Sequence, residues 1–126
     1  MPMRALLMDY AGVLTEGPEL LELVHRVRAS GVPTALVSDA DAVPEACAAG
    51  FDLVVLGAVL GVRKPDPEVY RRVAAELGMA VGECVVVDDH VRNVRGARTA
   101  GAVVVHHHSA AATIAEVEAL FELPVR

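Results

Sequence analysis

Short apolar runs recur along the whole chain and are separated by longer stretches of mixed character. Each run is continuous and rich in aliphatic residues. Such runs are typical of parallel strands, because helices cover both faces of a parallel sheet. The pattern predicts five buried strands, at residues 5–8, 34–37, 53–56, 84–87 and 102–105.

Helical periodicity fills the stretches between the predicted strands. Apolar residues three or four positions apart share one helix face in the stretches that begin near Pro18 and Asp66, and again near the C-terminus. Asp66 precedes Pro67, a pairing typical of an N-cap followed by the first helical position. Strands and helices therefore alternate. This order predicts a single domain over residues 1–126, with a three-layer, doubly wound α/β fold around a parallel five-stranded sheet.

Composition and charge narrow the classes of protein to consider. The chain has 126 residues, of which 54% are hydrophobic and only 3% aromatic, so its core must be mainly aliphatic. The formal net charge of −6 disfavours a general nucleic-acid-binding protein. No apolar run approaches the ~18 residues of a membrane span, and the N-terminal stretch lacks a signal-peptide pattern. Cys47 and Cys84 fit buried thiols in a reducing compartment. We therefore expect a cytoplasmic protein without a nucleic-acid or membrane partner.

Polar residues follow three of the predicted strands, at the point where each strand ends. Asp9 follows the first, Ser38 and Asp39 follow the second, and Asp88 and Asp89 follow the fourth. Ligands of such sheets bind beyond the carboxyl ends of the strands, so these side chains would meet at one edge. Each could be an ordinary cap or turn residue, but the whole set at that edge favours a site. Clustered carboxylates need a proton or a cation between them, and their oxygen atoms suit Mg²⁺.

Four segments carry a family resemblance. They are LLMDYAGVLT near the N-terminus, ALVSD at the second strand, GVRKPDPEVY at residues 61–70 and VVVDDHVRNVRGARTAGA at residues 85–102. In this order they resemble the motifs of the haloacid dehalogenase-like (HAD) superfamily of hydrolases. The third and fourth segments are the more specific. The resemblance implies a Rossmann-like core and a hydrolase, most simply a phosphatase.

The resemblance also implies roles for individual residues. Asp9 would be the nucleophile that forms an aspartyl-phosphate, a known role of carboxylates in covalent catalysis. Ser38 would donate a hydrogen bond to a phosphate oxygen, and Lys64 would neutralise charge on the phosphate and on Asp9. Gly12 would let the backbone approach the phosphate closely, and Asp39 would lie beside the substrate.

A magnesium ion is the cofactor that the resemblance implies. It would bind Asp9, the backbone carbonyl of Ala11 and the acidic pair. Asp89 would be the direct ligand and Asp88 would support it. The metal would shield the nucleophile from the charge of the phosphate and hold the transferring group.

Position 11 departs from the family pattern. The family's phosphatases usually have a second aspartate there, which protonates the leaving group and then activates water. Ala11 has no proton to give, and the loss of an acid–base group commonly costs ~10²–10⁴-fold in rate. Three interpretations stay open. In the first, the protein is a slow or specialised phosphatase in which water, Asp39 or His90 replaces the acid. In the second, it is an enzyme for substrates with a good leaving group, such as acyl phosphates. Otherwise it is a non-catalytic domain that binds metal and phosphate or a partner protein.

The spacing of the motifs leaves no room for a cap domain, because few residues separate Thr15 from Ser38 and Ser38 from Lys64. An open cleft would admit a phosphorylated small molecule or a phosphoprotein. A second copy could also cover it in a homodimer. The apolar stretch LGAVL at residues 56–60 is either a patch for self-association or part of the core.

Two further groups of polar residues have simple interpretations. We predict that the run His106–His108 is a solvated strand end, because neighbouring side chains of a strand point to opposite faces and could not all hold one ion. His90 is predicted to start a helix. Arginines at every third position of that helix indicate a charged face, and Arg92 or Arg95 could meet an anionic substrate at the mouth of the cleft.

Overall fold

A parallel sheet forms the centre of the molecule. The computed structural model describes residues 2–58 and 61–124. In this part of the chain the strands are Ala5–Met8 (β1), Thr34–Ser38 (β2), Leu53–Leu56 (β3), Cys84–Asp88 (β4) and Val103–His106 (β5). They pair in the order β3-β2-β1-β4-β5, and every pair is parallel. The five strands predicted from the sequence are confirmed, with ends that differ by a residue at most.

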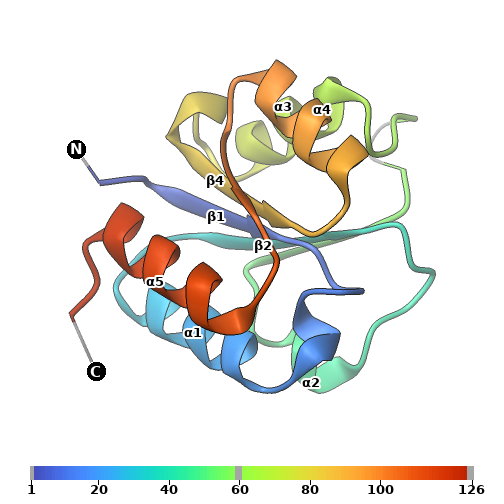
Figure 1. The fold of residues 1–126 in the computed structure, drawn as a ribbon. Coiled ribbons are helices and arrows are strands. Elements are labelled where there is room, and N and C mark those ends of the chain that lie inside the picture. Colours follow the sequence, from blue (N-terminus) through green and yellow to red (C-terminus); the bar gives the residue numbers. More distant parts are fainter. Residues whose placement is uncertain (1, 59–60, 125–126) are drawn as a thin grey trace.

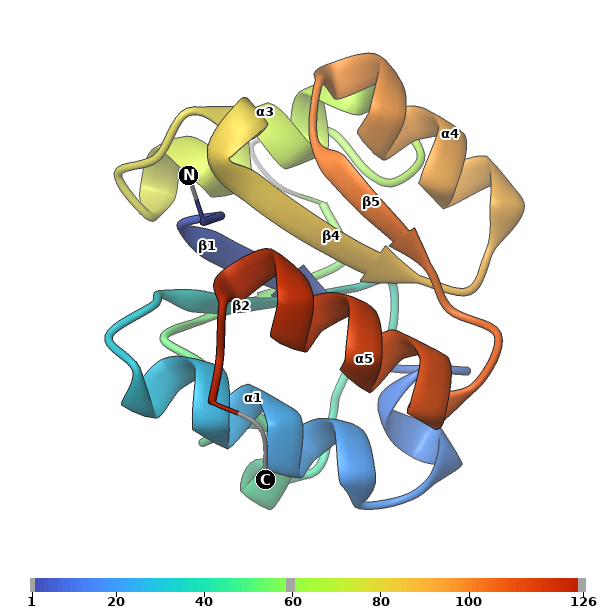
Figure 2. The same cartoon turned by 60° about the vertical axis from the view of Figure 1, so that its left-hand side comes forward.

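Helices cover both faces of this sheet and complete three layers (Figures 1 and 2). One face carries α1, α2 and α5, and the other carries α3 and α4. Asp66 caps α3, since its side chain accepts a hydrogen bond from the Glu68 N–H, and Pro67 is the first residue of that helix. The α-helices are Glu19–Ala29 (α1), Glu45–Ala48 (α2), Pro67–Glu76 (α3), Val91–Ala100 (α4) and Ala110–Phe121 (α5), with 3₁₀ turns at Leu14–Glu16 (η1) and Val81–Glu83 (η2).

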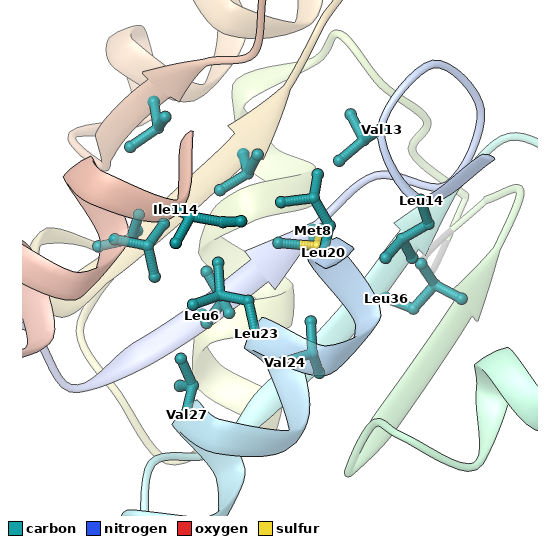
Figure 3. Close-up of a cluster of buried hydrophobic side chains, with 14 of the residues drawn as sticks. Leu6, Met8, Val13, Leu14, Leu20, Leu23, Val24, Val27, Leu36 and Ile114 are labelled. Carbon is teal, nitrogen blue, oxygen red and sulfur yellow. The ribbon is translucent and has the colours of Figure 1, made fainter. Parts of the chain in front are cut away.

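Alternating residues of the strands fill two separate cores. Leu6 and Met8 of β1 point to the side of α1 and α5, where Figure 3 shows them among Leu23 and Ile114. Leu7 points to the opposite side, against α3 and α4. Each such leucine or valine stabilises the fold by about 1.5–3 kcal/mol when it is fully buried. Burial on both faces explains why the strands are continuous apolar runs.

Short segments separate the predicted site residues along the chain. Between Asp9 and Ser38 the chain contains only η1 and α1, apart from loops. Between Ser38 and Lys64, the residues that the structure describes contain only α2 and β3, apart from loops. The fold is therefore that of a small α/β protein without a cap domain. The apolar stretch at residues 56–60 was expected either at the surface or in the core, and its positions 59 and 60 lie outside the described residues. Among the described helices, not one has both the length and the apolar character that crossing a bilayer requires.

Candidate active site

The sheet brings the predicted site residues together at its carboxyl edge. β1 lies between β2 and β4, so the residues that end these strands are neighbours. The N–H of Asp9 donates to the carbonyl of Val87 at 3.0 Å, which extends the β1–β4 pairing by one residue. Ser38 and Asp88 are the last residues of β2 and β4. The order of the strands changes direction at β1, and crevices at such points bind ligands in open α/β sheets.

Lys64 connects the carboxylates of this edge. Its Nζ donates to Asp9 Oδ1 at 3.0 Å, to Asp88 Oδ2 at 3.0 Å and to the carbonyl of Val37 at 2.9 Å. An ammonium group has three donors, and all three are used here. Only 3% of the Lys64 side chain is exposed. The lysine is therefore held in one position, with its charge between two carboxylates.

Burial and charge act in opposite directions on these groups. Burial raises the pKa of Asp9 above its ordinary value, and the Lys64 ammonium opposes this shift while Asp88 adds to it. Burial alone would lower the pKa of Lys64, but the carboxylates of Asp88 and Asp9 outweigh it and raise that pKa. Lys64 consequently stays positively charged at neutral pH.

The two residues of the acidic pair have different surroundings. Asp88 is 1% exposed, and both of its oxygens accept hydrogen bonds: Oδ1 from the N–H of His90, and Oδ2 from Lys64 and the side-chain amide of Asn93. Asp89 is exposed. No described residue donates a hydrogen bond to the Asp89 carboxylate. Asp88 is thus committed to the protein, whereas the Asp89 carboxylate is open to a ligand.

The carboxylates fit a divalent cation. Asp9, Asp88 and Asp89 each offer an oxygen atom, and these atoms all lie within 4.8 Å of one another. If all three carboxyls are ionised, three negative charges face the single positive charge of Lys64, which leaves an excess of two. A hard cation of charge +2 would balance this excess, and Mg²⁺ prefers such oxygen ligands. Ala11, whose carbonyl is the predicted fourth ligand, lines the same cleft.

Gly12 allows the loop after β1 to lie against the acidic pair. Its φ angle is +77°, in the region that glycine adopts most readily. A Cβ atom at this position would collide with the carboxylate of Asp89. The N–H of Gly12 donates to Thr15 Oγ1 at 2.9 Å, which holds the turn. The glycine therefore makes room for the Asp89 carboxylate.

Ser38 and Asp39 are the polar residues at the carboxyl end of β2. Ser38 is 3% exposed, and its Oγ accepts a hydrogen bond from the N–H of Ala40 at 3.1 Å. This arrangement leaves the hydroxyl proton of Ser38 free to be donated to a bound anion. Asp39 is exposed. Both residues line the cleft that also contains Asp9.

The cleft has a volume of about 450 Å³. A phosphorylated small molecule fits such a space. Ala11 is exposed, so no bulky side chain of residues 2–58 and 61–124 covers position 11. The residues that line the cleft are Asp9, Ala11, Gly12, Ser38, Asp39, Ala40, Lys64, Asp89, His90 and Asn93.

The structure adds two supporting residues that the sequence analysis did not assign. The Tyr70 hydroxyl donates to the carbonyl of Asn93 at 3.2 Å, and the imidazole Nε2 of His106 lies 3.0 Å from the carbonyl of Asp89. The Asp89 carbonyl is an acceptor, so Nε2 of His106 carries the hydrogen. Tyr70 is the last residue of GVRKPDPEVY, and His106 ends the strand beside the acidic pair. In the sequence, only these two positions could have indicated a supporting role for Tyr70 and His106.

The prediction for the histidine run is corrected at its middle residue. His107 is only 6% exposed, and its Nδ1 lies 2.7 Å from Thr113 Oγ1 of α5. The prediction of a solvated strand end took no account of α5, which packs over this position. His108 is exposed, as predicted. His90 is the N-cap of α4, which confirms its predicted place at a helix start.

Comparison with known proteins decides the family. The family model of haloacid dehalogenase-like hydrolases matches residues 15–101, which is more than half of the chain. The chain belongs to this family. The match within this HAD-like hydrolase includes Ser38, Lys64 and the acidic pair, and begins after Asp9.

Individual relatives differ in how much of the chain they match. Phosphatase MT3486 of Mycobacterium tuberculosis is 31% identical over a match of 102 residues, and the match covers 75% of this HAD-like hydrolase and 47% of that protein. Sesquiterpene phosphatase astK of Aspergillus oryzae is 36% identical over 70 residues, 56% of this chain and 36% of that protein. The chain thus spans less than half the length of these curated relatives. The crystal structure of an uncharacterized protein from Corynebacterium glutamicum is 32% identical, with a TM-score of 0.87, and the match covers 98% of each chain.

Proposed function

We propose that this protein is a Mg²⁺-dependent phosphatase that acts through an aspartyl-phosphate on Asp9. The observation that carries the proposal is the placement of Asp9 between a buried ammonium group and an acidic pair, inside a cleft that fits a phosphate ester. The phosphatases among its relatives support the same reaction class. The substrate is a phosphomonoester or an acyl phosphate.

The two oxygens of Asp9 have separate tasks in this proposal. Oδ1 accepts the hydrogen bond from Lys64, which fixes the carboxylate. Because Lys64 holds Oδ1, Oδ2 is the oxygen that would attack phosphorus. The new bond joins Oδ2 to phosphorus, and the bond from phosphorus to the leaving oxygen breaks. Water then attacks the phosphorus of the aspartyl-phosphate, which releases phosphate and regenerates Asp9.

Other residues of the cleft hold the transferring group. The Ser38 hydroxyl would donate to a phosphate oxygen, and Lys64 would offset negative charge as it develops. Asp9, Asp89 and the carbonyl of Ala11 would hold Mg²⁺, with Asp88 fixing the loop from behind. When bound, the ion supplies charge neutralisation at phosphorus. Gly12 keeps the loop close enough for these contacts.

The missing acid at position 11 decides which substrates react well. Because Ala11 cannot protonate the leaving oxygen, good leaving groups such as acyl or aryl oxygens should react fastest. The same feature supports the second candidate function, a domain that binds metal and phosphate without turnover. The intact nucleophile, lysine and acidic pair favour the enzyme, because a site that had lost its function would be expected to lack several of them.

The test compares turnover by the wild type and by two aspartate variants. Acetyl phosphate and 4-nitrophenyl phosphate are incubated with the protein and Mg²⁺, with and without a chelator. Hydrolysis that requires the metal and disappears in Asp9→Asn is expected. Asp41→Asn is the matched control, because Asp41 is exposed and does not line the cleft. Phosphate binding that requires Mg²⁺, without turnover of either compound, would instead establish the binding domain.

A further inference from the structure

A smaller hollow opens directly beside the phosphoryl cleft. Its volume is about 150 Å³, which is enough for a carboxylate or a second phosphate group. It shares four lining residues with the main cleft: Asp39, Lys64, His90 and Asn93. A ligand held at Asp9 could therefore extend into it without leaving the protein surface. The residues that belong to the hollow alone are Pro65 and Arg92.

Arg92 brings a positive charge to this hollow, where Asp39 brings a negative one. Its side chain is exposed, and no hydrogen bond or ion pair joins it to another described residue. It is the second residue of α4, and the first turn of this helix contains no aspartate or glutamate. A cation is unfavourable at a helix N-terminus, where the aligned peptide dipoles place partial positive charge. An anion bound beside Arg92 would be stabilised by the guanidinium and by the helix together.

We infer that this hollow is a subsite for a second anionic group of the substrate, and that Arg92 is the residue that selects for it. The inference rests on the proposed function and names its substrate class: a small phosphate ester that carries a carboxylate or a second phosphate a few bonds from the reacting phosphorus. The planar guanidinium can bind either group through two parallel hydrogen bonds. The carboxylate of Asp39 also lines the hollow and repels an anion, so the preference is moderate.

Binding of two unreactive probes tests the subsite independently of turnover. Phosphonoacetate carries a carboxylate beside its phosphonate, and phosphonoacetamide replaces this carboxylate with a neutral amide of the same size. Their affinities are measured by calorimetry in the presence of Mg²⁺ for the wild type, Arg92→Gln, Arg92→Lys and Arg98→Gln. Arg98 is the matched control, because it lies on the same helix, is exposed and lines neither hollow.

The expected result is that the wild type and Arg98→Gln bind phosphonoacetate about fivefold more tightly than phosphonoacetamide, the upper range for a solvent-accessible ion pair. Arg92→Gln should bind both probes equally, and Arg92→Lys should keep part of the preference. Equal binding by the wild type, or a preference that survives in Arg92→Gln, would overturn the subsite alone. Failure of the wild type to bind either probe would overturn the subsite and the phosphoryl site together. If the wild type shows the expected preference for phosphonoacetate but does not hydrolyse 4-nitrophenyl phosphate, the proposed function is overturned and the subsite stands as a binding site.

Discussion

Lys64 Nζ lies 3.0 Å from Asp9 Oδ1, although the two residues are 55 positions apart in the sequence. Lys64 is also the only lysine of the chain. The parallel sheet brings Asp9 to its carboxyl edge, and the loop before α3 reaches back across that edge with the ammonium group. The stability of the fold therefore depends on an ion pair that includes the candidate nucleophile.

Replacing Lys64 with methionine should destabilise the protein strongly. The carboxylates of Asp9 and Asp88 would remain in a buried environment without a counter-charge, which costs about 3 kcal/mol or more. The loss should be smaller at about pH 5 than at about pH 8, because burial raises the pKa of Asp9 and protonation of this carboxylate removes part of the uncompensated charge. Urea denaturation at the two pH values measures this. Arg4→Met removes the exposed ion pair with Glu83 and should cost under about 1 kcal/mol. Equal losses in the two variants would contradict the structural role of Lys64.

Replacing Gly12 with alanine should lower the affinity for Mg²⁺, in addition to a small loss in the free energy of unfolding. The new methyl group would push against the Asp89 carboxylate, and an outer contact of this kind commonly changes metal affinity by about tenfold. Gly31→Ala is the matched control, because Gly31 also has a positive φ, +91°, but no described residue beyond its chain neighbours has an atom within 4 Å of its Cβ position. Both variants should lose about 1 kcal/mol to backbone strain. Titration calorimetry with Mg²⁺ separates them, and equal metal affinities would refute the steric argument.

Introducing an aspartate at position 11 should increase turnover of alkyl phosphates. Ala11 is exposed at the cleft, so the new carboxyl group can be accommodated and can protonate a poor leaving group. A gain of at least about tenfold is expected for alkyl phosphates, with a smaller gain for 4-nitrophenyl phosphate, which needs no acid. Ala40→Asp places a carboxyl elsewhere in the same cleft and should give no such gain. A uniform change for both substrates would argue against acid catalysis from position 11.

His107 should make the stability of the fold depend on pH. Burial lowers the pKa of His107 below its ordinary value of about 6.5, so the unfolded chain takes up this proton at a higher pH than the folded protein. The contribution of His107 is therefore complete above about pH 6.5 and declines as the pH falls further, by no more than about 1.4 kcal/mol per pH unit. Thermal unfolding between about pH 5 and about pH 8 measures the slope.

Asparagine at position 107 is the informative replacement for this histidine. Its side-chain amide can occupy the place of Nδ1 and keep the contact with Thr113, but it does not titrate. The dependence of the melting temperature on pH should become flatter in His107→Asn. An unchanged slope would assign the effect to other groups.

Several features could be predicted because they follow from local rules. Strands buried on both faces need continuous apolar runs, and β4 at Cys84–Asp88 is such a run in the sequence. The cap of α3 follows from Asp66 and Pro67, since a carboxylate satisfies free N–H groups and proline loses nothing at the first position. The meeting of Asp9 with Asp88 follows from the rule that parallel strands present their carboxyl ends at one edge.

Other features depend on elements that pack from elsewhere in the chain. The alternation of side chains along a strand predicts that neighbouring histidines point to opposite faces. Only the packing of α5 determines that His107 is buried. The difference between Asp88, whose two oxygens are occupied, and Asp89, whose carboxylate is open, is likewise invisible in the sequence. It depends on where Lys64 and Asn93 place their donors.

The sequence by itself therefore determined the class of fold, the order of its elements and the set of residues at the candidate site. These properties depend on hydrophobic periodicity and on caps, which act over a few residues. Only the tertiary structure decided which carboxylate is committed to the protein, which histidine is buried and where Arg92 lies relative to the cleft. Such properties depend on distances of a few ångströms between distant segments, and local patterns do not set those distances.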